Sequence, residues 1–487
     1  MLLLSIALPI VLGLGILLKG EFKNRNTLLA ITGAGLAVTA ALAMGAAFTD
    51  QRELLLFSFG KNLDLYFHVD NLGKLFAVVV NGAWVLSGIY AFEYMKHEQE
   101  ENRFFGFYLM VQGTLNGLVF AGGMVSYYLF YELMTLLSVP LILHNRSKEA
   151  IKGGLKYLFY SLFGAYMVLF GIFFLNRFAD SLAFLPGGSL NPGAVAGNET
   201  LMQIVAFSMI LGFSVKAGMF PLHAWLPTAH PVAPAPASAV MSGIIVKMGV
   251  LGMIRSVYYL VGADFIRGTW VQTVWLSLAL VTVFMGSMLA YREKVMKKRL
   301  AYSTVSQASY ILFGLALLQP QGMVGALLHV VFHAVIKSCL FLSAGAIIYK
   351  THKTQVSDLR GIGKEMPVTI WCYTFAAAAL IGIPPASGFI SKWYLATGAL
   401  DSGIPVFSWL GPVVLLTSAL LTAGYLLPIT VNGFLPGADF DYDTLEKKEP
   451  NQTMRIPLLV FAILAVLLGM FPNLLTEYLA GIAASVL

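Results

Sequence analysis

Apolar runs long enough to cross a bilayer as helices recur along the whole chain, separated by short polar segments. A helical span needs about 20 consecutive, mostly apolar residues, and apolar runs of this kind are the primary signal of secondary structure. The pattern predicts an all-α polytopic membrane protein with about fourteen transmembrane helices. The predicted spans are residues 2–18, 27–48, 71–92, 104–122, 124–143, 153–176, 201–218, 236–260, 269–291, 299–318, 322–348, 367–400, 406–434 and 454–484.

The composition agrees with this pattern and excludes other classes of protein. Of 487 residues, 58% are hydrophobic and 11% are charged, whereas a soluble protein carries roughly a quarter charged residues. A soluble enzyme, a secreted disulfide scaffold and a disordered protein are therefore excluded. The net charge of +7 is attributed to basic loops and not to a nucleic-acid partner. The first run has no basic flank or cleavage site, so it is interpreted as a span and not as a removable signal.

Basic residues are distributed unevenly between the predicted loops. Loops that follow odd-numbered spans hold 21 lysines and arginines, Lys297 among them, whereas loops and helix ends that follow even-numbered spans hold six, including Arg255. Because cytoplasmic loops carry the excess of Lys and Arg, the odd loops are predicted to be cytoplasmic. The membrane is predicted to be the cell membrane, also called the inner membrane, and both chain termini are then predicted on its outer side.

Four lysines remain inside apolar spans after this assignment. A charged side chain near the bilayer centre costs about 2.5–3.5 kcal/mol on insertion scales, and burial makes an ammonium release its proton more readily. A lysine whose charged and neutral forms are close in free energy is suited to carry protons. This favours a function in ion transport over a structural role by snorkelling or pairing. The four residues are Lys216, Lys247, Lys337 and Lys392.

One acid, Glu132, lies in the middle of the span at 124–143, with apolar residues on both sides. A carboxylate at that depth needs a positive partner, and we predict that Glu132 pairs with Lys216. The alternative is a static ion pair that joins two helices.

Three titratable residues share one stripe of the eleventh span. His329, His333 and Lys337 follow one another at intervals of four residues, which places them on one helical face. This spacing favours a proton relay. A metal site is the alternative, but it lacks a nearby third ligand. The tenth span adds polar residues that either hold water or form interhelical hydrogen bonds, namely Ser303, Thr304, Ser306, Gln307 and Ser309.

Two of the buried lysines lie beside Gly/Pro interruptions. Gly218 and Pro221 follow Lys216, and Pro384-Pro385 precede Lys392. Paired broken helices in corresponding halves of a transporter point to its ion site, although two ordinary proline kinks would give the same pattern. The breaks are five spans apart, which favours an inverted repeat. The predicted organisation is an N-terminal three-helix segment (1–103), two five-helix repeats (104–260 and 261–434) and a C-terminal loop with the last helix (435–487).

Three motifs resemble the antiporter-like subunits of the respiratory complex I superfamily. They are KAGMFPLHAWLPTAH at 216–230, LAYSTVSQ at 300–307 and DLRGIGK at 358–364. That superfamily includes proton-pumping subunits of NADH–quinone oxidoreductases, membrane-bound hydrogenases and formate hydrogenlyases, and Mrp-type sodium/proton antiporters. The resemblance implies fourteen helices, two inverted five-helix bundles and broken seventh and twelfth helices.

The resemblance also implies roles for individual residues. Glu132 would tune Lys216, Lys247 would connect the two halves, and Lys392 would exchange protons with one side. The relay of the eleventh helix would comprise His329, His333 and Lys337. Auxiliary roles are implied for His223, His230, Ser306 and Gln307.

The departures from the family pattern are informative. The M-type subunit of complex I carries glutamate where this chain has Lys392, and the long lateral helix of the L-type is not seen after the last span. This combination of features is most similar to the D-type chain of Mrp antiporters and to related hydrogenase subunits.

The sequence therefore predicts a proton-translocating subunit, with or without sodium/proton antiport, of a redox-driven pump or Mrp-type antiporter. The two cysteines, Cys339 and Cys372, are fewer than the roughly four ligands that an iron–sulfur or zinc site needs. Any iron–sulfur, flavin or nickel–iron centre is expected on partner subunits, which would be antiporter-like and small membrane chains and, in the redox branches, a peripheral arm. The alternatives are a stand-alone transporter of a small solute and a quinone-reactive membrane enzyme.

Overall fold

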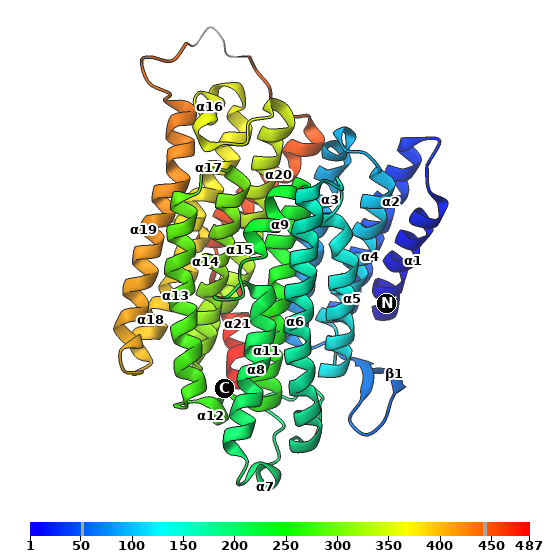
Figure 1. The fold of residues 1–487 in the computed structure, drawn as a ribbon, viewed down its shortest axis with the longest axis vertical. Helices are drawn as coiled ribbons and strands as arrows, with labels where there is room; N and C mark the ends of the chain where they lie inside the picture. Colours follow the sequence, from blue (N-terminus) through cyan, green and yellow to red (C-terminus); the bar gives the residue numbers. More distant parts are fainter. Residues whose placement is uncertain (50–52, 442–445) are drawn as a thin grey trace.

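The computed structural model describes residues 1–49, 53–441 and 446–487. Its helices run side by side in one bundle (Figure 1). The all-α membrane class is thereby confirmed. The first half contains α1 (Leu2–Lys19), α2 (Arg25–Thr49), α3 (Asn71–Tyr94), α4 (Glu101–Val119), α5 (Met124–Ile142), α6 (Lys148–Phe178), α7 (Pro192–Val195), α8 (Glu199–Ala217), α9 (Leu226–Val232), α10 (Ala235–Val240) and α11 (Val246–Ser256).

The second half has the same character. It contains α12 (Ala263–Ile266), α13 (Trp270–Arg292), α14 (Met296–Ala316), α15 (Pro320–Thr351), α16 (Ile362–Glu365), α17 (Pro367–Ile381), α18 (Ser387–Asp401), α19 (Phe407–Phe434), α20 (Gln452–Met470) and α21 (Asn473–Val486). Among the described residues, eleven helices are long and apolar enough to cross a membrane. The total of fourteen spans stays a prediction.

Both predicted breaks are present. α8 ends at Gly218 and α17 ends at Gly382, with φ of 79° and 96°. Glycine adopts this left-handed conformation without steric cost, which makes it a common residue at helix C-termini. The chain then turns before α9 in the first case and before α18 in the second. Each gap leaves main-chain carbonyls at the end of the preceding helix available to other donors.

The structure differs from the predicted elements at two places. The predicted span 454–484 is two helices, α20 and α21, because Pro472 has no N–H to continue the helical ladder and the chain breaks at Phe471–Pro472. A hairpin of β1 (Leu54–Ser58) and β2 (Asp64–Phe67) connects α2 to α3 and was not predicted. The hairpin lies toward one end of the bundle, opposite the end where α16 lies (Figure 1).

The centre of the bundle is formed by the segment 235–261 and by α15. In their most apolar stretches, 100% and 89% of the residues are buried inside the protein. Two π-helical turns, Met241–Ile245 and Val257–Val261, flank α11. α15 packs against α14, α17 and α18, and α11 packs against α8. These central helices carry most of the polar residues predicted to act in transport.

Candidate functional site: a buried row of lysines and histidines

Lys216 lies in a cradle of three hydroxyl groups. It occupies the last turn of α8 and is fully buried. Its Nζ donates to Thr135 Oγ1 at 2.9 Å, Tyr157 OH at 2.9 Å and Ser161 Oγ at 2.8 Å. The ring of Tyr157 also faces the ammonium, 4.2 Å from its centroid. All three donors of the ammonium are thus used by α5 and α6.

The predicted direct pairing of Glu132 with Lys216 is wrong. Glu132 is half-buried on α5, and its side chain forms no hydrogen bond or ion pair with another described residue. Thr135, one of the three hydroxyl residues that bond Lys216, lies one helical turn after Glu132 on the same face of α5. The two charges still interact electrostatically. The pairing fails because three hydroxyls already satisfy the Lys216 ammonium.

Lys247 joins the two halves of the bundle. Its Nζ lies 2.5 Å from Nδ1 of His333 on α15 and donates to the main-chain oxygen of Ser242 at 2.6 Å. Gly249 follows Lys247 on α11, and a Cβ added there would lie 2.9 Å from Cβ of Lys216. The absence of a side chain at Gly249 therefore lets α11 approach α8 and brings the two lysine-bearing helices together.

The row continues from His333 toward the second break. The rings of His333 and His329 stack with centroids 5.8 Å apart. Nδ1 of His329 lies 2.9 Å from Oγ of Ser391, which precedes Lys392 on α18. Lys392 Nζ donates to the main-chain oxygens of Leu380 at 2.6 Å and Ile381 at 2.9 Å. A lysine on one half-helix thereby caps the C-terminus of the other, where the helix dipole favours a cation.

Lys337 belongs to the predicted stripe but bonds away from the histidines. It is fully buried on α15, and its Nζ donates to the main-chain oxygen of Leu300 at 3.0 Å and to Ser303 Oγ at 2.8 Å. Ser303 in turn accepts from Tyr425 OH at 2.8 Å. The stripe spacing placed three residues on one helix correctly, but their bonding partners come from α11, α14 and α18.

The polar residues predicted on α14 divide into two groups. Ser306 bonds Val283 and Ser287 of α13, both at 2.8 Å, and so joins helices. Gln307 is fully buried, and neither its Oε1 nor its Nε2 has a partner among the described residues. The same is true of both ring nitrogens of His230. Buried polar atoms that lack a protein partner normally bond to ordered water.

His223 stands apart from the row. It lies in the gap between α8 and α9, is partly exposed, and its Nδ1 is buried without a partner among the described residues. Its ring is 6.1 Å from that of Phe220. In the structure it contacts none of the four lysines.

Several polar residues of the interior were not assigned from the sequence. Lys297 and Arg255 were placed in a loop and at a helix end, yet they are 6% and 2% exposed. Lys297 bonds the main-chain oxygen of Pro231 at 3.2 Å, and Arg255 pairs with Asp70 at 2.5 Å. The hydroxyls that surround Lys216 were also missed, although Tyr157 and Ser161 have a detectable i, i+4 spacing on α6.

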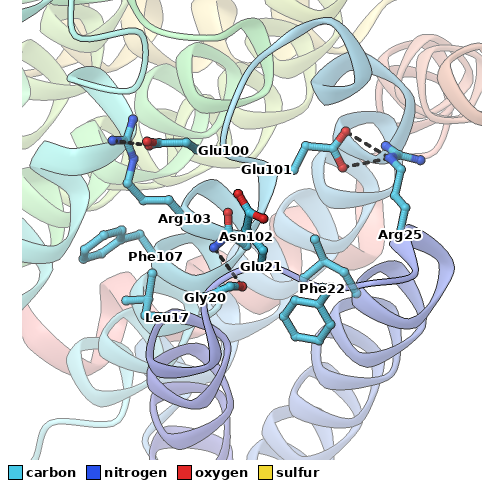
Figure 2. A pocket seen from close by; sticks show the side chains of 11 residues that line it. Leu17, Gly20, Glu21, Phe22, Arg25, Glu100, Glu101, Asn102, Arg103 and Phe107 are labelled. Atoms are coloured by element: carbon cyan, nitrogen blue, oxygen red, sulfur yellow. Dashed lines mark hydrogen bonds and ion pairs between the residues drawn. The ribbon is translucent and has the colours of Figure 1, made fainter.

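One other charged region of the protein forms ion pairs among its own residues. A pocket of about 620 Å³ lies between the α1–α2 turn and the start of α4 (Figure 2). Its arginines are paired locally, Arg25 with Glu101 at 2.8 Å and Arg103 with Glu100 at 2.5 Å. Within the described part of the chain, no three His, Cys, Asp or Glu residues are grouped as a metal site would need.

Comparison with known families places these features in context. The family model described as "NADH:quinone oxidoreductase/Mrp antiporter, TM" matches residues 121–422, which include Lys216, Lys247, Lys337 and the partly exposed Lys392. A second model, "NADH-Ubiquinone oxidoreductase (complex I), chain 5 N-terminus", matches residues 57–105.

Individual relatives span more than one branch. NADH-quinone oxidoreductase subunit N of Desulforudis audaxviator is 31% identical over 83% of this chain and 81% of its own. Hydrogenase-4 component B of Escherichia coli is 29% identical over 86% of this chain and 64% of its own. A chain in the structure of the Mrp complex from Dietzia sp. DQ12-45-1b shares the fold, with a TM-score of 0.85, 21% identity and coverage of 100% and 97% of the two chains.

Proposed function

This chain belongs to the NADH:quinone oxidoreductase/Mrp antiporter family, and we propose that it moves protons as a membrane subunit of a multisubunit complex. The partners would be other membrane subunits, because the relatives are named as subunits or components of larger enzymes and antiporters. Redox cofactors would lie on those partners. The assignment to the Mrp or hydrogenase branch, and sodium as a second transported ion, form part of this proposal.

The observation that carries the proposal is the buried row itself. Lys247, His333, His329, Ser391 and Lys392 follow one another through contacts between α11, α15 and α18. Buried ionisable groups in a membrane are costly and mark ion pathways by default. We propose that Glu132 and Lys216 form the other end of this row and act on it electrostatically.

Proton transfer along the row is derived from the groups that face one another. The Lys247 ammonium can donate to Nδ1 of His333, and the neutral amine can accept from it. A proton gained by one lysine disfavours charge on its neighbours, so charge at Lys216 would move protons away from Lys247. The half-buried Glu132 would set this balance through its own charge.

The proposed topology follows from the loops and the breaks. Both termini would lie outside the cell membrane and the basic loops inside. The two repeats would be residues 104–260 and 261–434, each with one broken helix, α8–α9 and α17–α18.

The test is proton transport by the intact complex in sealed vesicles, followed with a pH-sensitive dye. Lys392→Ala and Glu132→Ala should each abolish transport while the complex still assembles. Lys447→Ala, at an exposed loop position, is the matched control and should transport as the wild type does. Wild-type transport in either of the first two variants contradicts the proposal. Full transport by the purified chain alone would instead indicate a stand-alone transporter.

A further inference from the structure

A groove on the outer surface of the bundle lies between α17 and α20, away from the buried row. It has a volume of about 480 Å³, and its lining is apolar or aromatic apart from the thiol of Cys372. Large side chains in it stay half-exposed, with Trp371 at 50%, Phe375 at 47% and Ile463 at 54%. Both flanking helices are apolar, so this surface faces the hydrocarbon of the bilayer or another hydrophobic partner.

One helical turn before the groove, α20 carries an arginine whose side chain has no partner in the described part of the chain. Arg455, Leu459, Ile463 and Leu467 follow one another at intervals of four residues on α20, so they share one helical face. The last three line the groove. The side chain of Arg455 forms no hydrogen bond or ion pair with another described residue, and its Nε is buried without a partner. The helical face that carries this cation therefore continues into the apolar groove.

Two acids at the start of α17 have partners other than Arg455. Glu449 accepts hydrogen bonds from the first residues of α17, one of them at 2.6 Å. Glu365 pairs with Lys353 at 3.5 Å and Lys448 at 3.6 Å. The guanidinium is left with donors in a planar arrangement that suits a phosphate group.

The dimensions fit one leaflet of a membrane. Twelve residues separate Arg455 from Leu467, which corresponds to about 18 Å of helix. One half of the hydrocarbon core is about 15 Å thick. The Arg455 end belongs to the basic side of the protein, where anionic lipids are enriched. We propose that this groove binds an anionic phospholipid, with its phosphate on Arg455 and one acyl chain between α17 and α20.

This lipid would stabilise the packing of helices around the second break. Gly469 follows Leu467 on α20, and a Cβ added to it would collide with the main-chain oxygen of Pro385. α20 thus packs directly on the gap that precedes Lys392. A lipid that holds α20 against α17 fixes the spacing of the helix whose carbonyls bind that lysine. The proposed lipid site does not depend on which ion the protein transports or on the direction of transport.

A photoreactive amino acid at Ile463, in the complex purified in detergent, identifies the occupant. We expect an adduct with an anionic phospholipid retained from the membrane. The same group at Phe173, which is 70% exposed on α6 and does not line the groove, should give no such adduct because detergent replaces bulk lipid there. An adduct with another protein subunit, or equal adducts with zwitterionic lipid, would overturn the proposal.

Binding is then measured with added phosphatidylglycerol or phosphatidylethanolamine. Arg455→Gln should lower the retained phosphatidylglycerol at least about tenfold, the scale of one lost charge-assisted hydrogen bond, and Arg455→Lys should restore part of it. Val466→Phe should fill the groove and reduce binding of both lipids. Lys447→Gln is the charge control and should behave as the wild type. Unchanged phosphatidylglycerol retention in Arg455→Gln would contradict the site.

Discussion

The two broken helices hold their lysines in different ways. At the first break, Lys216 ends α8 and donates to three side-chain hydroxyls of α5 and α6, each within 2.9 Å. At the second break, Lys392 lies beyond the gap on α18 and reaches back to two main-chain carbonyls of α17. The first lysine is therefore held by neighbouring helices and the second by the other half of its own span.

The difference lies in which protonation state each site can accommodate. A hydroxyl accepts from an ammonium or donates to a neutral amine, whereas a carbonyl only accepts. The negative end of the α17 dipole adds a preference for the cation. The cradle of Lys216 thus suits both forms of lysine. The site of Lys392 favours the ammonium, so we expect release of its proton to need a change in neighbouring charge or in the break itself.

Replacing each lysine by arginine should have the largest effect. Arginine stays protonated, so Lys216→Arg and Lys392→Arg should each lower proton transport at least about a hundredfold, as expected for a lost acid–base group. The measurement is dye-detected proton uptake by vesicles that contain the complex. Substantial transport in either variant would show that its lysine does not need to release a proton.

Thermal unfolding of the same variants should separate the two breaks. Arginine at position 216 overfills a cradle shaped for a compact ammonium, which should lower stability by about 1–3 kcal/mol. Arginine at position 392 can still donate to the carbonyls of Leu380 and Ile381, so its stability should stay near that of the wild type. Equal losses at both positions would remove the structural distinction drawn between the sites.

Two tyrosines provide a matched test of hydroxyl contacts. Tyr157 bonds Lys216 through its OH, whereas Tyr310 faces Lys392 with its ring, at 5.1 Å, and sends its OH to Leu415. Tyr157→Phe should reduce transport about tenfold, because a hydrogen bond to a charged group is lost. Tyr310→Phe keeps the ring and should leave transport nearly unchanged. The reverse order of the two effects would contradict the assigned contacts.

A pH dependence of stability should appear in the first half of the bundle. Burial and the charge of Arg103 lower the pKa of His144, in the turn between α5 and α6, to about 4. The unfolded chain takes up this proton near pH 6.5, so stability should fall as the pH drops from 6.5 to 4, by roughly 3 kcal/mol at most.

The variant His144→Gln should show a shallower decline in its unfolding temperature over that interval. The corresponding turn between α14 and α15, residues 317–319, contains no histidine, so that turn offers no equivalent titrating group. An unchanged slope in the variant would show that His144 is not the titrating group.

The sequence predicted the chemistry of the row better than its connections. Lys216 and Lys392 were found because charge in an apolar run is rare and because Gly and Pro interrupt helices locally. The contact between Lys247 and His333 joins residues 86 positions apart, and no local pattern reveals it. Glu132 was expected to pair directly with Lys216, and the competing hydroxyls of Tyr157 and Ser161 were missed because they resemble ordinary interhelical contacts in a sequence.

By itself, the sequence determined the membrane class, the two breaks and the set of titratable residues, since each follows from burial cost or helix chemistry along the chain. The tertiary structure decided which groups face one another. Helix rotation and spacing are set by packing, as at Gly249, where the missing side chain admits Lys216. Packing also buried Lys297 and Arg255, which apolar periodicity alone had left at the surface.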